Sequence, residues 1–124
     1  MFHRTRHARA RRRFLRRQRH RPAHLMVTVH LAADPRSMLH GHRPGDPYLL
    51  ADRFLLDNLG EVDDFAVLDR IFAALNDHPH PADVEHTRRW YQHRHRSLSV
   101  GDIVTIDHRR YACTPWSWDA LPAD

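Results

Sequence analysis

Histidine is the residue type in this chain that most strongly suggests chemistry. Thirteen of the 124 residues are histidine, and six of them form His-x-His pairs, a spacing that on a β-strand lets both rings bind one metal ion. Two pairs fall instead in loops rich in proline and glycine, and the third lies at a predicted helix end, where residues two apart diverge. Because ligand type without convergent geometry supports a metal centre only weakly, we predict no metal site and no cofactor. The pairs are His40/His42, His78/His80 and His93/His95.

The only cysteine, Cys113, is a second candidate. A cysteine nucleophile needs a base within hydrogen-bond reach and a group that orients this base, and His108 is the nearest histidine along the chain. Because Cys113 falls on a predicted strand, we interpret it as a small buried hydrophobic residue and predict no catalytic residue. An enzyme that depends on a metal or on this cysteine stays open as an alternative. A single cysteine also excludes an intramolecular disulfide and favours the cytoplasm.

Acidic residues offer no catalytic pattern. Asp102 follows Gly101, and we interpret it as a turn or strand-entry residue whose carboxylate accepts local backbone hydrogen bonds. The sequence has neither a glycine-rich phosphate loop nor a Gly-x-Ser-x-Gly motif. Six further carboxylates form a predicted acidic patch that solvates a face, caps a helix or attracts a basic segment. They are Asp52, Asp57, Glu61, Asp63, Asp64 and Asp69.

Arginine dominates the first 22 residues. Ten arginines and no acidic residue give this arm a charge of +10, whereas the other 102 residues, with ten arginines against fifteen acids, carry −5. Guanidinium groups pair bidentately with phosphates and release counterions, so such an arm can bind DNA or RNA with steeply salt-dependent affinity. We predict that residues 1–24 are disordered when free and bind nucleic acid through Arg9, Arg11, Arg12, Arg13, Arg16, Arg17 and Arg19.

The arm also has plainer interpretations. Dense like charge is equally typical of a solvated tail, and translation that starts near Met26 would make part of the arm a non-native extension. The segment Arg11–Arg16 resembles a twin-arginine export signal, but no apolar stretch follows it. With Phe14 as the only aromatic residue in the dense run, base stacking and sequence specificity are not expected. No apolar run is long enough to cross a membrane, so we predict a cytoplasmic protein without membrane contact.

Residues 25–124 predict one small domain. Leu25–Leu31 is rich in β-branched residues and predicts a strand, and the glycines and prolines of Ala32–Pro47 predict a loop. Tyr48–Leu56 fits a short helix or a strand, and we favour the strand. Asp63 or Asp64 caps a predicted helix that ends at Asn76–Pro79.

The remaining segments add a second helix and more strands. Val84–Arg96 predicts a short helix, and Leu98–Ile106 predicts a turn that leads into a strand. Tyr111–Thr114 is its predicted partner, joined through Asp107–Arg110. Trp116 and Trp118 are expected on one face of an extended segment.

Together these elements predict an α+β fold, in which antiparallel strands pack with one or two short helices. The expected core combines one face of the first helix with the strand that follows Gly101. It consists of Phe65, Leu68, Ile71, Phe72, Leu75, Val100, Val104 and Ile106.

Three ordered motifs carry a family resemblance. Leu68–Phe72, Leu75–Pro79 and Ser97–Val104, followed by Tyr111, are similar to the YodL-like domain over residues 63–121. Its pattern is a short helix ending in an Asn-x-x-His-Pro-type segment, then a Ser-Leu-Ser-x-x-Asp-Val-Val strand and a strand with tyrosine. Here one residue fewer separates Asn76 from the histidine. The resemblance implies a small domain of unassigned activity that recurs in plasmids, conjugative elements and phages, and it supplies no catalytic residue.

These observations lead to two functional hypotheses. The first is a non-enzymatic accessory protein of a mobile genetic element that acts through protein or nucleic-acid contacts. The second is a sequence-nonspecific DNA- or RNA-binding protein that acts through its arm. The frequent arginine, histidine and alanine are also typical of high-GC actinobacterial genes, which alone accounts for part of this composition.

Overall fold

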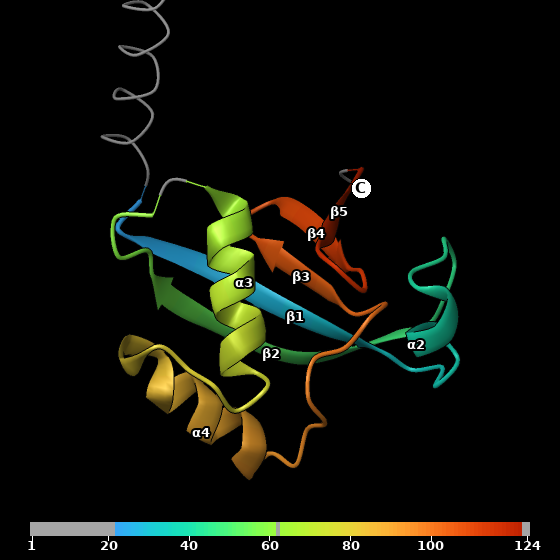
Figure 1. Ribbon diagram of the computed structural model, residues 1–124, viewed down its shortest axis with the longest axis horizontal. Helices are drawn as coiled ribbons and strands as arrows, with labels where there is room; N and C mark the ends of the chain where they lie inside the picture. Colours follow the sequence, from blue (N-terminus) through green and yellow to red (C-terminus); the bar gives the residue numbers. More distant parts are fainter. Residues whose placement is uncertain (1–21, 62, 123–124) are drawn as a thin grey trace, which may run out of the picture.

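A five-stranded antiparallel sheet forms the centre of the protein (Figure 1). The computed structural model describes residues 22–61 and 63–122, so the predicted arm lies almost wholly outside the described residues. The strand order is β2-β1-β3-β4-β5, which confirms the predicted α+β domain with antiparallel strands. The strands are β1 (His24–Ala32), β2 (Tyr48–Asp57), β3 (Ile103–Ile106), β4 (Arg109–Cys113) and β5 (Trp118–Leu121).

Helices α3 (Asp64–Ala74) and α4 (Val84–Gln92) pack on one face of this sheet (Figure 1). The predicted cap is confirmed, since the Asp63 side chain accepts a hydrogen bond of 2.9 Å from the Phe65 N–H. A 3₁₀ turn, η1 (Pro81–Asp83), leads into α4. A single-turn helix, α2 (Ser37–His40), interrupts the segment that was predicted to be a loop. No helix of the described segments is long and apolar enough to cross a membrane.

The central strand β1 shows why the sheet forms here. Its odd-numbered residues from Leu25 to Leu31 are buried against the helices, as expected for a strand whose alternate side chains face one side. In β2, Phe54 and Leu56 are buried on the same side, whereas Leu55 between them is exposed. This alternation confirms the strand that the sequence favoured only weakly.

The buried face of α3 differs from the expected one. Phe65 and Phe72 were predicted to be core residues, but they are 42% and 37% exposed. The packed stripe is rotated toward Val67 and Ala74, which are buried. The two rings instead make edge contacts with aromatic residues of β4 and β5, at centroid distances of 5.9 Å from Tyr111 and 6.4 Å from Trp118. Val100 is only half-buried, whereas Leu68, Ile71, Leu75, Val104 and Ile106 are confirmed in the core.

The C-terminal strands differ from expectation in two details. The β3–β4 turn is tighter than predicted, because Asp107 adopts a φ of 54° and β4 already begins at Arg109. Trp118 is buried on β5, but Trp116 is 96% exposed. The predicted common face of the two tryptophans is therefore wrong, since Trp116 lies in the turn before β5, where side chains do not alternate as they do on a strand.

Candidate functional site

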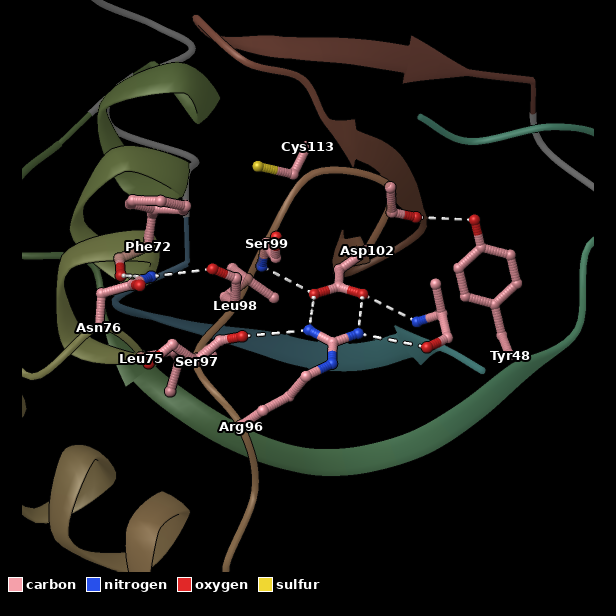
Figure 2. A network of polar contacts seen from close by, with 12 residues as sticks. Tyr48, Phe72, Leu75, Asn76, Arg96, Ser97, Leu98, Ser99, Asp102 and Cys113 are labelled. Carbon is pink, nitrogen blue, oxygen red and sulfur yellow. Dashed lines mark hydrogen bonds and ion pairs between the residues drawn. The ribbon is translucent and has the colours of Figure 1, made fainter. Parts of the chain in front are cut away.

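The carboxylate of Asp102 is the centre of a polar network at one end of the sheet (Figure 2). Asp102 is fully buried, and its oxygens accept hydrogen bonds of 2.8 Å from the backbone N–H groups of Ala32 and Ser99. Both terminal nitrogens of Arg96 donate to it at 2.7 Å. This bond to Asp102 raises the pKa of Arg96 above its ordinary value.

This network holds together segments that are distant in sequence. Arg96 also donates to the carbonyl oxygen of Ala32, and its own carbonyl accepts a hydrogen bond of 3.0 Å from the indole N–H of Trp90. The loop before β3 is thereby fixed to the end of β1 and to α4. Because all four donors already occupy the buried carboxylate, Asp102 has no free position for a substrate, and its role is structural.

Tyr48 extends the polar contacts toward the α2 loop. Its hydroxyl donates to the carbonyl oxygen of Gly101 at 2.7 Å, while Nδ1 of His42 lies 2.7 Å from the same hydroxyl. Burial, with smaller contributions from Asp46 and Asp102, raises the pKa of Tyr48 to about 12. The tyrosine therefore stays protonated and serves as a fixed donor.

Cys113 does not form a nucleophilic pair with a base. Burial, followed by the charges of Asp102 and Asp69, raises the pKa of this thiol to about 11, whereas a reactive cysteine needs a lowered pKa. His108 lies in the turn at the opposite end of β4, about 16 Å away along a strand at 3.3 Å per residue. The thiol points away from the Arg96–Asp102 pair in Figure 2.

The three histidine pairs have different environments. His80 accepts a hydrogen bond from the N–H of Ala82 and caps η1. The helix predicted over Val84–Arg96 already ends at Gln92, so His93 and His95 lie beyond α4, and their rings stack at a centroid distance of 6.0 Å. Within the described part of the chain, no three His, Cys, Asp or Glu side chains are grouped so that they could hold a metal ion.

The predicted acidic patch is divided among local contacts. Asp52 forms an ion pair with Arg89 at 3.0 Å, and Asp64 accepts hydrogen bonds from Arg109 and from the hydroxyl of Tyr111. The latter bond, together with burial as the larger cause, raises the pKa of Tyr111 to about 12. These carboxylates stabilise the helix side of the fold.

A buried ion pair between α3 and η1 has no signature in the sequence. Nε of Arg70 lies 2.7 Å from Oδ2 of Asp83, and both side chains are almost fully buried. Arg70 also donates to the carbonyl oxygen of Asp57 at the end of β2. Its hydrophobic neighbours along α3 indicate a buried position, but only the fold reveals the partner.

The helix-free face of the sheet carries a polar row. Thr28 on β1 pairs with Arg53 on β2 and with Thr105 on β3, and Thr105 pairs with Arg110 on β4. Directly opposed residues in antiparallel strands share a face, and the neighbours of Thr28 along β1 face the helices. Arg53 is exposed, and it forms no ion pair with a carboxylate among the described residues. This face therefore places two arginines in one row across four strands, while two carboxylates, Asp57 on β2 and Asp119 on β5, lie on the same side of the sheet.

His30 on β1 lies close enough to both arginines of the row for their charges to act on it. The pKa of His30 is lowered, first by burial and then by the charges of Arg110 and Arg53. No local pattern in the sequence identifies these residues, because only the strand register places them in one row. The predicted binding residues of the arm, Arg9 to Arg19, lie outside the described residues.

The comparisons with known proteins add no further information. The chain matches no family model, and no curated protein or solved structure is significantly similar to it. The resemblance to the YodL-like domain therefore stays a prediction.

Proposed function

We propose that this protein is a non-enzymatic accessory protein that binds DNA or RNA through its arginine-rich arm and through the helix-free face of its sheet. The observation that carries the proposal is the row Arg53, Thr28, Thr105 and Arg110. Two guanidinium groups three strand spacings apart, about 14 Å at 4.8 Å per strand, can each bind a different phosphate. Between them, the half-buried Thr105 can donate a further hydrogen bond to the same backbone, whereas Thr28 is buried.

The position of the arm supports a joint contact. The arm leads directly into β1, which contributes Thr28 to the row, and the side chain of Asn58 donates to the carbonyl oxygen of Pro22 at this junction. A polyanion bound by the arm is therefore brought close to the sheet. Because all of these contacts are to phosphate, the proposed binding is independent of base sequence.

Removing the arm tests its contribution. Leu25 is a fully buried residue of β1, so a variant that lacks residues 1–21 removes all ten arginines of the arm and leaves the core complete. We expect weaker binding to single-stranded and duplex DNA and to RNA, and a smaller slope of log affinity against log salt. Equal affinity and equal slope for the two proteins would show that the arm takes no part.

Single substitutions test the sheet face. Arg53→Gln or Arg110→Gln should reduce the salt slope by about 0.7–0.9, the value for one lost phosphate contact. Arg88→Gln is the matched control, since Arg88 is an exposed arginine on α4, away from the row. If all three variants bind alike, the sheet face is not part of the interface.

The cellular setting is proposed on the sequence resemblance alone. Similarity of residues 63–121 to the YodL-like domain supports a role in a plasmid, an integrative element or a phage, in the cytoplasm. Genes for a relaxase, for replication or for transfer beside this gene would support that setting. A position within a metabolic operon would contradict it.

A further inference from the structure

A pocket lies between the α2 loop and the hairpin of β4 and β5. Its volume is about 640 Å³, which lies within the usual range for a site that binds a small organic molecule. Ala112 on β4 is among the residues that line it, and its small side chain leaves this space on the helix-free side of the sheet. The apolar walls include Leu39, Val100 and Pro115, and the polar groups include His40, His42 and Asp119.

The hydrogen bonds of the two histidines fix which ring nitrogen is protonated. Nδ1 of His40 lies 2.7 Å from the carbonyl oxygen of Gly41, which can only accept, so this nitrogen donates. The single proton of the Tyr48 hydroxyl goes to Gly101, so Nδ1 of His42 must donate to the tyrosine oxygen. In the neutral ring this leaves Nε2 of both histidines as an acceptor.

Asp119 adds a negative charge to the same pocket. It lies directly opposite Ala112 on the neighbouring strand, and its carboxylate has no hydrogen-bond or ion-pair partner among the described residues. The residues that line the pocket therefore include one carboxylate and two histidines whose neutral rings can accept at Nε2. Asp119 is the only charged side chain among the lining residues other than the histidines, so a cationic donor can pair with it, whereas an anionic ligand would meet its negative charge. Arg110, two residues from Ala112 along β4, lies outside this lining.

We propose that this pocket binds a compact organic cation, in which a guanidinium, amidinium or ammonium group is attached to an apolar body. The nitrogen donors would pair with Asp119 and with the Nε2 acceptors, and the apolar body would contact the walls. Trp116 follows Pro115 and is nearly fully exposed. Although Trp116 does not line the pocket, it adjoins the lining residue Pro115 in sequence, and an exposed indole of this kind can add a cation–π contact to an organic cation.

Three aromatic probes of nearly equal size test the charge preference. Benzamidine is cationic, benzamide is neutral and benzoate is anionic, so calorimetric titration of the full chain at pH 8 compares charge at almost constant shape. We expect saturable binding of benzamidine that is at least tenfold tighter than that of the other two. Equal affinities, tighter binding of benzoate, or no saturable binding of benzamidine up to 10 mM would overturn the proposal.

Matched variants test the location of binding. Asp119→Asn should weaken benzamidine binding at least fivefold, and His42→Phe should weaken it in the same direction. Asp77→Asn and His78→Phe are the controls, because these two residues are exposed beyond the end of α3. Thermal unfolding of each variant shows whether it is folded. A folded Asp119→Asn protein that binds benzamidine as tightly as the parent would place the ligand elsewhere and overturn the assignment.

Discussion

Arg96 and Asp102 form a bidentate ion pair in which both nitrogen-to-oxygen distances are 2.7 Å. Asp102 is fully buried, whereas about two-fifths of the Arg96 side chain is exposed. The arginine thus covers the carboxylate on its solvent side, and two backbone N–H groups bind it from within. This arrangement makes the pair a junction between the end of β1 and the loop that enters β3.

Substitution of Asp102 should destabilise the fold. Asp102→Ala leaves the buried N–H groups of Ala32 and Ser99 without acceptors, and each unsatisfied donor costs about 1–3 kcal/mol. We expect the free energy of unfolding, measured in urea, to fall by about 2–5 kcal/mol. Asp119→Asn, which removes a carboxylate without a partner among the described residues, should change it by less than about 0.5 kcal/mol. A loss below 1 kcal/mol for Asp102→Ala would contradict the structural role.

The buried pair Arg70–Asp83 should show strong coupling. Asp83→Ala leaves the buried guanidinium with only the carboxylate of Glu61, 3.9 Å away, and removal of one partner of a buried pair typically costs about 3–5 kcal/mol. The double variant Arg70→Met, Asp83→Leu removes both charges and should lose less stability than Asp83→Ala alone. Urea unfolding of Arg70→Met, of Asp83→Leu and of the double variant gives the coupling energy. Additive losses would mean that the two side chains act independently.

Local patterns predicted the elements of the fold but not the contacts between them. The helix cap at Asp63 and the strand of β1 follow from residues close in sequence, because caps and alternation are local properties. Asp102 was identified as a residue that accepts backbone hydrogen bonds, and its bond to Ser99 confirms this. Its bond to Ala32, 70 positions away, depends on the pairing of β1 with β3, which no local pattern specifies.

The candidate sites show the same limit. The arginine row became visible only through the register of four strands, since Thr28 and Arg110 have no common motif. Similarly, His40 and His42 were correctly placed outside the strands, but sequence alone did not show that Tyr48 fixes one of the rings. The apolar residues of α3 form a stripe that is wider than the surface buried against the rest of the protein. Phe72 lies at the edge of this stripe, which explains why it was wrongly predicted to be a core residue.

Two substitutions on α3 distinguish its buried face from its flank. Leu68 is fully buried, so Leu68→Ala should reduce the free energy of unfolding by about 2–5 kcal/mol. Phe72→Ala should cost only about 1 kcal/mol, because the ring is partly exposed and loses mainly its edge contact with Trp118. Chemical denaturation of both variants under the same conditions makes the comparison. A larger loss for Phe72→Ala than for Leu68→Ala would reverse the assignment of the faces.

The buried thiol of Cys113 should make the fold sensitive to alkaline pH. Its pKa is raised to about 11 in the folded protein, above the ordinary value of about 8.5 in an unfolded chain. The folded state therefore holds this proton more tightly, and its stabilising effect is complete below the unfolded pKa and is lost as pH rises through the folded pKa. We expect the free energy of unfolding to fall between about pH 8.5 and pH 11, and the difference of about 2.5 between these pKa values sets an upper limit of about 3 kcal/mol on the contribution of this residue.

The variant Cys113→Ala isolates this contribution. Its cavity lowers stability at every pH, but its unfolding free energy should decline less steeply than that of the parent between pH 8.5 and pH 11. The raised pKa values of Tyr48 and Tyr111, about 12 each, add a further decline at higher pH in both proteins. Alkylation by iodoacetamide measures the accessibility of the Cys113 thiol independently. At pH 9 this thiol should react only when the protein is unfolded in urea. Rapid reaction of the native protein, with equal pH slopes for parent and variant, would show that Cys113 is accessible rather than buried.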